Sequence, residues 1–270
     1  MHLSGLFIYP VKSLRGHAVP AATLDARGFA DDRRFMVVDA DNRFLTQRTV
    51  PRMALIETAL TTDTLTLRHA ASGSVAVPRP ASGVIRSVQV WRDTVDADDC
   101  GEAVATWLSD ILEQTCHLVQ IGEAFHRPAN PEGARASDKV SFADGYPLLV
   151  LSEASLAELN NRLLATQNEP IPIDRFRPNI VVSGTTPFAE DSWQRWQIGS
   201  AIFRTINPCA RCVITTTNQQ TAERGPEPLR TLATYRRDAT KPSNVNFGMN
   251  VVQESKTGTI RVGDPLTLLD

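Results

Sequence analysis

The sequence predicts a mainly β protein with a few helices, in which a small N-terminal β-barrel-like domain packs on a second β-barrel domain. Three observations lead to this prediction. Short segments with apolar residues at alternating positions recur along the chain, as in half-buried strands. Only two segments show the apolar spacing of an amphipathic helix. The sequence also lacks a series of strands and helices with glycine-rich phosphate turns, which disfavours a doubly wound parallel sheet.

The first hundred residues carry the strand signals of the N-terminal domain. Residues 35–39 are largely apolar, and residues 43–46 follow a polar turn, so the two segments predict a hairpin. Residues 64–68 alternate strictly with a period of two, which is the side-chain period of a strand. Short apolar runs at 75–77 and 88–91 follow turns that contain glycine or proline. Several short strands at regular spacing are typical of a small barrel or sandwich.

Two helices and a loop separate these strands from a second set. Apolar residues recur at helical spacing in residues 104–112 and again in residues 156–163. The polar loop 128–139 lies between them and marks the region of the domain boundary. We therefore predict one domain over residues 1–120 and a second over residues 121–270. The further strands are predicted at 180–183, 201–204, 212–217, 245–252 and 259–269.

Composition excludes several classes of protein. The 270 residues include 28 basic and 30 acidic side chains, and the formal net charge of −2 gives no sign of a nucleic-acid partner. No apolar run approaches the roughly 18 residues of a membrane span, and the N-terminus lacks the pattern of a signal peptide. The four cysteines are too few and too unevenly spaced for a disulfide framework. We expect a cytoplasmic protein with no membrane or nucleic-acid partner.

Three polar segments are candidates for an anion site. The turn after the first strand contains Lys12 and Ser13, a pair that can hold a phosphate or can simply be a solvated turn. Arg33 and Arg34 are adjacent before a predicted strand and would point to opposite faces if they belonged to it. An inward arginine needs an anionic partner, because an unpaired buried charge is costly. In residues 174–179, Arg177 and Asn179 would share one face of a strand and together offer a cation and an amide. For both arginine segments the alternative is a surface salt bridge.

The segment Cys209-Ala-Arg-Cys212 is the most informative motif. A thiolate beside a guanidinium can bind a soft metal or act as a nucleophile, whereas a free cysteine is commonly buried and inert. Two cysteines are half of a four-thiolate zinc site, and no second such pair follows in the sequence. A thioredoxin-like motif expects a helix at the first cysteine, but β-branched residues follow here and predict a strand.

These motifs resemble those of MOSC-domain proteins that carry an N-terminal MOSC β-barrel domain, of the YcbX-like and mitochondrial amidoxime-reducing-component-like type. The match lacks the C-terminal ferredoxin domain that some of these proteins carry. The matching stretches run in family order at 9–13, 32–35, 151–156, 176–180, 190–193, 209–216, 227–232, 247–248 and 258–265.

The resemblance implies a cofactor and the residues that bind it. Proteins of this family carry a molybdenum cofactor, in which the dithiolene of molybdopterin and one protein cysteine bind the metal. By this resemblance Cys212 is the metal ligand and a catalytic residue, and Asp144 is an acidic catalytic residue near the metal. The implied cofactor-binding residues are Lys12, Ser13, Arg34, Arg177, Asn179 and Arg211. The family often has serine where this chain has Ala210. At the family level the resemblance also implies pyridoxal phosphate binding.

The activity implied by the resemblance is reduction of small N-hydroxylated compounds, namely hydroxylamines, amidoximes and N-hydroxylated bases. Reduced molybdenum would take the oxygen of the N–O bond, and two electrons and two protons would regenerate it and release water. The electrons are expected from a separate ferredoxin-, flavodoxin- or reductase-like protein. The alternative is a non-enzymatic carrier of sulfur or of the cofactor, with a persulfide on Cys212.

Overall fold

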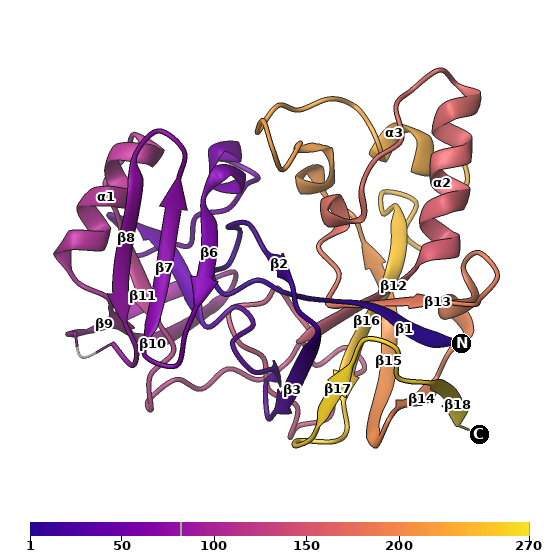
Figure 1. Cartoon of the computed structure of the whole chain (residues 1–270), viewed down its shortest axis with the longest axis horizontal. Coiled ribbons are helices and arrows are strands. Elements are labelled where there is room, and N and C mark those ends of the chain that lie inside the picture. The colour runs from indigo at the N-terminus through magenta and orange to yellow at the C-terminus, as the bar shows by residue number, and fades with distance from the viewer. Residues whose placement is uncertain (82, 270) are drawn as a thin grey trace.

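The computed structural model describes residues 1–81 and 83–269, which form four β-sheets with three α-helices (Figure 1). This mainly β architecture with a few helices confirms the predicted fold class. The largest sheet has eight strands, and every neighbouring pair is antiparallel except β12 and β13. Its order is β18 (Leu266–Leu269), β14 (Arg195–Ile198), β15 (Ala201–Ala210), β16 (Asn246–Gln253), β12 (Leu148–Ser152), β13 (Ile180–Ser183), β1 (His2–Ile8) and β2 (His17–Ala18).

The other three sheets are smaller. A four-stranded sheet has the order β5 (Phe35–Asp39), β11 (Cys116–Gln120), β10 (Asp93–Asp99) and β9 (Ile85–Val90). One three-stranded sheet joins β6 (Glu57–Leu60), β7 (Thr64–His69) and β8 (Gly73–Pro78), and the other joins β17 (Thr259–Arg261), β3 (Ala21–Asp25) and β4 (Gly28–Phe29).

The helices follow the apolar spacing seen in the sequence. Helix α1 (Glu102–Leu112) buries Val104, Leu108 and Ile111 in the apolar core of the N-terminal half, together with residues of the four-stranded sheet. Helix α2 (Glu153–Ala165) begins after Ser152, whose hydroxyl accepts a hydrogen bond from the Ser155 amide and so caps the helix. Among the described helices, which also include the short α3 (Leu229–Leu232), none is long and apolar enough to cross a membrane.

Strand pairing links the two ends of the chain. Strand β1 pairs with β13, and β3 pairs with β17, so the first segments lie within the C-terminal part of the structure (Figure 1). Leu3, Leu6 and Phe29 are fully buried in one apolar cluster with Trp196 and Phe203. A division between residues 120 and 121 stays a prediction, and the pairing of these early strands crosses it. As a result, the turn that follows β1 lies next to loops of the C-terminal half.

Three predicted strands differ in the structure. The run expected at 259–269 is divided between β17 and β18, which lie in different sheets, and Arg43 and Phe44 form isolated bridges in place of the strand expected at 43–46. The third lies in the cysteine segment. The sequence favours a strand over residues 212–217, but a short 3-10 helix forms at Val213–Thr216. The Thr215 hydroxyl donates to the Cys212 carbonyl at 3.0 Å, and the Thr216 hydroxyl donates to the Val213 carbonyl at 2.8 Å. These local bonds give the backbone an alternative to strand pairing, which overrides the β propensity of the threonines.

Candidate active site

A cleft of about 150 Å³ lies where the loops of the two halves meet. Its wall combines the turn after β1, the loop before β12, the loop before β13 and the end of β15. Seven of the eight site residues predicted from the sequence line it, namely Lys12, Ser13, Asp144, Arg177, Asn179, Arg211 and Cys212. Segments far apart in sequence therefore build one site.

Arg34 is the predicted residue that does not line the cleft, and Arg33 lies there instead. Strand β5 begins at Phe35, and Arg33 occupies the preceding turn with a φ of 52°. The Arg34 guanidinium turns away and donates to both oxygens of Asp25, at 2.8 and 2.7 Å, and to the Phe29 carbonyl at 3.0 Å. Arg34 thus has its anionic partner within the protein.

Two guanidinium groups lie over the ring of Tyr9. The Arg33 guanidinium carbon is 4.5 Å from the ring centroid, and that of Arg177 is 4.3 Å from it. The Tyr9 hydroxyl donates to the Pro178 carbonyl at 3.0 Å, which fixes the ring. Arg33 also pairs with buried Asp32 at 2.5 Å. Cation–π contact and the Asp32 carboxylate together offset part of the cost of placing two cations side by side.

Arg177 remains without a counter-ion. It ends the 3-10 helix Ile173–Phe176 in the left-handed conformation, and only 9% of its surface is exposed. Within the described part of the chain, its guanidinium makes no ion pair and donates no hydrogen bond. Burial lowers the pKa of Arg177 to about 10, so the group stays charged at neutral pH. A buried, charged and unpaired guanidinium is suited to an external anion.

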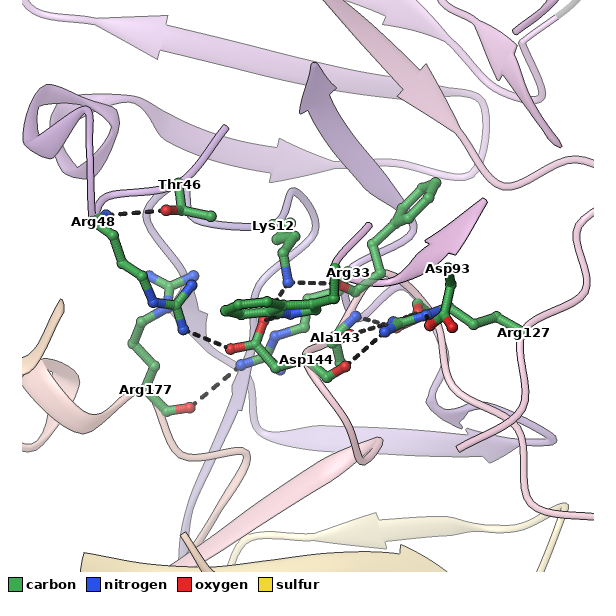
Figure 2. A network of polar contacts seen from close by, with 12 residues as sticks. Lys12, Arg33, Thr46, Arg48, Asp93, Arg127, Ala143, Asp144 and Arg177 are labelled. Carbon is green, nitrogen blue, oxygen red and sulfur yellow. Dashed lines mark hydrogen bonds and ion pairs between the residues drawn. The ribbon is translucent and has the colours of Figure 1, made fainter. Parts of the chain in front are cut away.

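Asp144 collects three donors at the mouth of the cleft (Figure 2). Lys12 Nζ pairs with Asp144 Oδ1 and also donates to the Phe142 carbonyl at 2.8 Å. Arg48 donates to Asp144 Oδ2 at 2.9 Å, and the Trp91 indole donates to Oδ1 at 3.1 Å. The Asp144 side chain is 52% exposed. Its charge is therefore already matched by cations from the N-terminal half.

The pKa values of Asp144 and Lys12 are both lowered, but for different reasons. Packing around Asp144 disfavours its charge, but Lys12 and Arg48 outweigh this and hold its pKa well below the ordinary value. Burial lowers the pKa of Lys12 to about 8, against the opposing effect of Asp144. At neutral pH the carboxylate is thus ionised and the ammonium still holds its proton. Asp144 accepts hydrogen bonds here and has no proton to donate.

Arg127 fixes the loop that carries Asp144. It is 3% exposed and donates to the carbonyl groups of Ser141, Ala143 and Asp144, the last at 2.7 Å (Figure 2). Its Nε pairs with Asp93 at 2.7 Å. Because one rigid guanidinium holds several carbonyl groups, the backbone at Asp144 is tied to Arg127 and, through Asp93, to strand β10.

The cysteine segment closes the opposite wall. The Arg211 guanidinium donates to Cys209 Sγ at 2.9 Å and to the Phe176 carbonyl at 2.6 Å, while its buried Nε has no partner among the described residues. Both Cys209 and Cys212 are partly exposed free thiols. Burial disfavours the charge of Arg48, but Asp144 and Cys212 outweigh it and raise its pKa. Arg48 pairs with Asp144 and lines the same cleft as Cys212.

Asn179 lines the cleft, but its side chain is already used by the protein. Its Oδ1 accepts from Arg33 at 3.1 Å and from the Leu149 amide at 3.3 Å, and its Nδ2 donates to the Phe7 carbonyl at 3.2 Å. Asn179 therefore positions Arg33 and ties β1 to the sheet. Ser13 differs, because no hydrogen bond from its hydroxyl to the described residues is present, and its φ is 66°.

Sequence reasoning missed several residues of the site. Arg48 lies in a loop with no pattern that marks it, and Trp91 lies in a tight turn with a φ of 58°. Asn250 carried a usable signal, since it is a polar residue between the apolar Met249 and Val251 in the middle of strand β16. Among residues 1–81 and 83–269, no group of three or more His, Cys, Asp or Glu side chains is arranged to hold a metal ion.

Comparison with known proteins matches two family models to successive parts of the chain. The family described as "MOSC N-terminal beta barrel domain" matches residues 1–115, and the "MOSC domain" matches residues 137–267. The chain is 35% identical to mitochondrial amidoxime-reducing component 1 of Homo sapiens, over 98% of this chain and 82% of that protein. The corresponding protein of Mus musculus is 37% identical, over 98% and 81%.

A second type of relative shares the same region. The molybdenum cofactor sulfurase of Oryza sativa subsp. japonica is 30% identical over 92% of this chain, which corresponds to 32% of the sulfurase. The matches to the amidoxime-reducing components extend over nearly the whole chain and over four fifths of those proteins. This chain belongs to the MOSC-domain family, with a MOSC N-terminal β-barrel domain followed by a MOSC domain.

Proposed function

We propose that this protein is a molybdenum-cofactor-dependent reductase of N-hydroxylated compounds, including amidoximes, hydroxylamines and N-hydroxylated bases. The observation that carries the proposal is the charge of the cleft around Cys212. Five cationic side chains and one carboxylate line it, namely Lys12, Arg33, Arg48, Arg177 and Arg211 with Asp144. The similarity to amidoxime-reducing components supports the same reaction class.

The residues of the cleft fit a molybdenum cofactor. Such a group combines a phosphate with anionic dithiolene sulfurs, and the cleft has an excess of buried positive charge. Among residues 1–81 and 83–269, Arg177 has no counter-ion within ion-pair distance and the buried Arg211 Nε has no hydrogen-bond partner. We assign these two arginines, with Ser13 and Arg33, to the anionic parts of the cofactor, and Cys212 to the metal. When bound, the cofactor would supply two-electron reduction of the N–O bond.

Lys12 and Asp144 are assigned to proton supply and charge balance in the cleft. Cleavage of an N–O bond to an N–H compound and water consumes two protons. Lys12 Nζ holds a proton at neutral pH with a pKa of about 8, and it faces the cleft. Asp144 remains ionised, so we assign it the role of positioning Lys12 and Arg48. Reducing equivalents are proposed to come from a separate ferredoxin-, flavodoxin- or reductase-like protein.

The test is to measure molybdenum in the purified protein and then benzamidoxime reduction with a chemical reductant. We expect near-stoichiometric molybdenum and conversion of benzamidoxime to benzamidine. Cys212→Ser should lose both, whereas Cys100→Ala, which changes a thiol of the N-terminal core, should retain both. A protein that binds molybdenum but reduces no N-hydroxylated compound would contradict the proposed reaction.

The second candidate is a carrier with a persulfide on Cys212. The observations that favour it are the partial exposure of this thiol and the similarity to molybdenum cofactor sulfurases. Mass spectrometry of the intact protein separates the two. Metal-free protein with one additional sulfur on Cys212 supports the carrier, and loss of that sulfur in Cys212→Ser locates it.

A further inference from the structure

The lining of the cleft also includes four neutral residues, namely Tyr146, Pro147, Leu149 and Asn250, which we call the neutral end. Asn250 belongs to the middle of β16. Across the sheet, Asn250 is paired with Asn207 of β15 on one side and with Leu149 of β12 on the other. Strand register therefore fixes the backbone of this end, whereas turns build the cationic end.

A chain of hydrogen bonds fixes which atom Asn250 presents to the cleft. The Tyr146 hydroxyl lies 2.5 Å from the Glu132 carbonyl, which can only accept, so the hydroxyl must donate to it. Burial raises the pKa of Tyr146, which keeps this proton in place at neutral pH. The hydroxyl oxygen must then accept from Asn207, so the Asn207 group 2.9 Å away is its amino group.

The remaining orientation follows by elimination. With its amino group directed at Tyr146, Asn207 directs its Oδ1 at Asn250, and the Asn250 amino group donates to it at 2.9 Å. Asn250 Oδ1 is then the atom left over, and it has no donor among residues 1–81 and 83–269. The Glu132 carbonyl thus fixes, through the Tyr146 hydroxyl, which atoms of Asn207 and then of Asn250 donate and which accept. The result is a neutral acceptor held at a fixed position in the cleft.

We propose that Asn250 Oδ1 is a substrate-positioning acceptor that binds the amino N–H of an N-hydroxylated amidine or amino-heterocycle. The inference rests on the proposed function and adds the feature that selects substrates. An acceptor in a cleft with excess positive charge favours a neutral ligand that donates N–H, and it offers nothing to an oxyanion. Compounds without an N–H beside the hydroxylated nitrogen therefore bind without this contact.

The test compares two ligands that differ only at the amino group, benzamidoxime and N,N-dimethylbenzamidoxime. Binding to the purified holoprotein without reductant is measured by calorimetry, and KM and kcat are measured with reductant. We expect Asn250→Leu to weaken binding of benzamidoxime and to raise its KM by about 5- to 10-fold, the usual value of one neutral hydrogen bond. Binding of the dimethyl compound and kcat should change less than about 2-fold.

Two further variants separate positioning from structural damage. Tyr146→Phe removes the hydroxyl that orients Asn207, so the amides are free to reverse, and a smaller loss confined to benzamidoxime is expected. Asn246→Leu is the matched control, because Asn246 lies on the same strand but bonds to Asp238 outside the cleft. This control should leave the preference between the two ligands unchanged.

The outcomes are distinguishable from those of the proposed function. The calorimetric comparison needs no turnover, so selective weakening in Asn250→Leu supports the inference even if no reductase activity is found. Equal weakening of both ligands, or no weakening of either, overturns it. Loss of molybdenum in Asn250→Leu also overturns it, because that result assigns the residue to the cofactor.

Discussion

The two ends of the cleft recognise ligands by different means. The cationic end is built from turns, where Ser13, Arg33 and Arg177 have φ values of 66°, 52° and 55°. The neutral end is built on regular strand pairing, where Asn250 faces Asn207. Turns can bring cations together from distant segments, but each cation needs a partner or an aromatic surface. A sheet offers less charge but holds a neutral group in a fixed register. We therefore predict that the charge of the cationic end binds the cofactor. The fixed acceptor of Asn250 at the neutral end selects the substrate.

The largest effect on the cationic end is expected from replacement of Arg177. Arg177→Met is expected to reduce molybdenum content and benzamidoxime reduction by about 10- to 100-fold, since a charged hydrogen bond is lost. The free energy of unfolding of the metal-free protein should stay the same or rise by up to about 2 kcal/mol, because a buried unpaired charge is removed. Metal analysis and urea denaturation measure the two effects. A loss of both stability and metal would indicate that Arg177 is structural.

Arg34 provides the matched control for Arg177. Its guanidinium is bonded to both Asp25 oxygens and to the Phe29 carbonyl. Arg34→Met should therefore lower the free energy of unfolding by about 1 to 2 kcal/mol, because the buried Phe29 carbonyl and the partly exposed Asp25 carboxylate lose their donor. Molybdenum content of the folded fraction should be unchanged. The two arginines would then show opposite patterns of stability and cofactor binding.

A change at Asp144 tests whether this carboxylate serves charge balance. Asp144→Asn should destabilise the protein by about 1 to 2 kcal/mol at pH 7, a value reduced by solvent screening because the side chain is half exposed. The folded pKa lies below the unfolded one, so the contribution is present above the unfolded value and is lost as pH falls through the folded value. Urea denaturation from pH 7 to strongly acidic pH should show the two proteins converge. A constant gap between them would contradict this assignment.

Raising the pH should weaken anion binding at the cationic end and leave the neutral end unchanged. The pKa of Lys12 is lowered to about 8, below its ordinary value of 10.5. Between these values the unfolded chain holds more protons than the folded one, so stability rises with pH while positive charge in the cleft falls. We expect the affinity of the metal-free protein for pyrophosphate to fall a few-fold, on the order of one lost charge contact, between pH 7 and 9.5. Lys12→Met should show a smaller pH dependence in both measurements.

The sequence predicts the fold better than it predicts the orientation of side chains. Alternating apolar residues and two helical stripes were enough for the mainly β class, because burial of one face determines both patterns. Arg33 and Arg34 show the limit. Strand alternation allows either arginine to face inward, and the choice depends on where β5 begins and on the distant Asp25. Such a choice needs tertiary contacts that no local pattern contains.

The cysteine segment and Asn250 illustrate two further limits. Threonines after Cys212 favour a strand by propensity, but their hydroxyls bond to nearby carbonyl groups and form a 3-10 turn. Asn250 is visible as a polar residue between apolar neighbours in the middle of a strand, yet its role depends on Tyr146 and on the Glu132 carbonyl. A resemblance to a known family supplies site residues that lie in motifs. It does not supply residues such as Arg48 that lie outside them.

The smallest expected effect is at Trp91, which contacts Asp144 and Arg48. Trp91 is 42% exposed, donates its indole N–H to Asp144 and lies 4.7 Å from the Arg48 guanidinium, measured from the ring centroid. Trp91→Phe keeps an aromatic surface for Arg48 but removes the indole donor. Because Lys12 and Arg48 still hold Asp144, the change should cost less than about 1 kcal/mol of stability and alter KM for benzamidoxime less than about 3-fold. A larger loss would show that this hairpin turn, and not the cations, sets the position of Asp144.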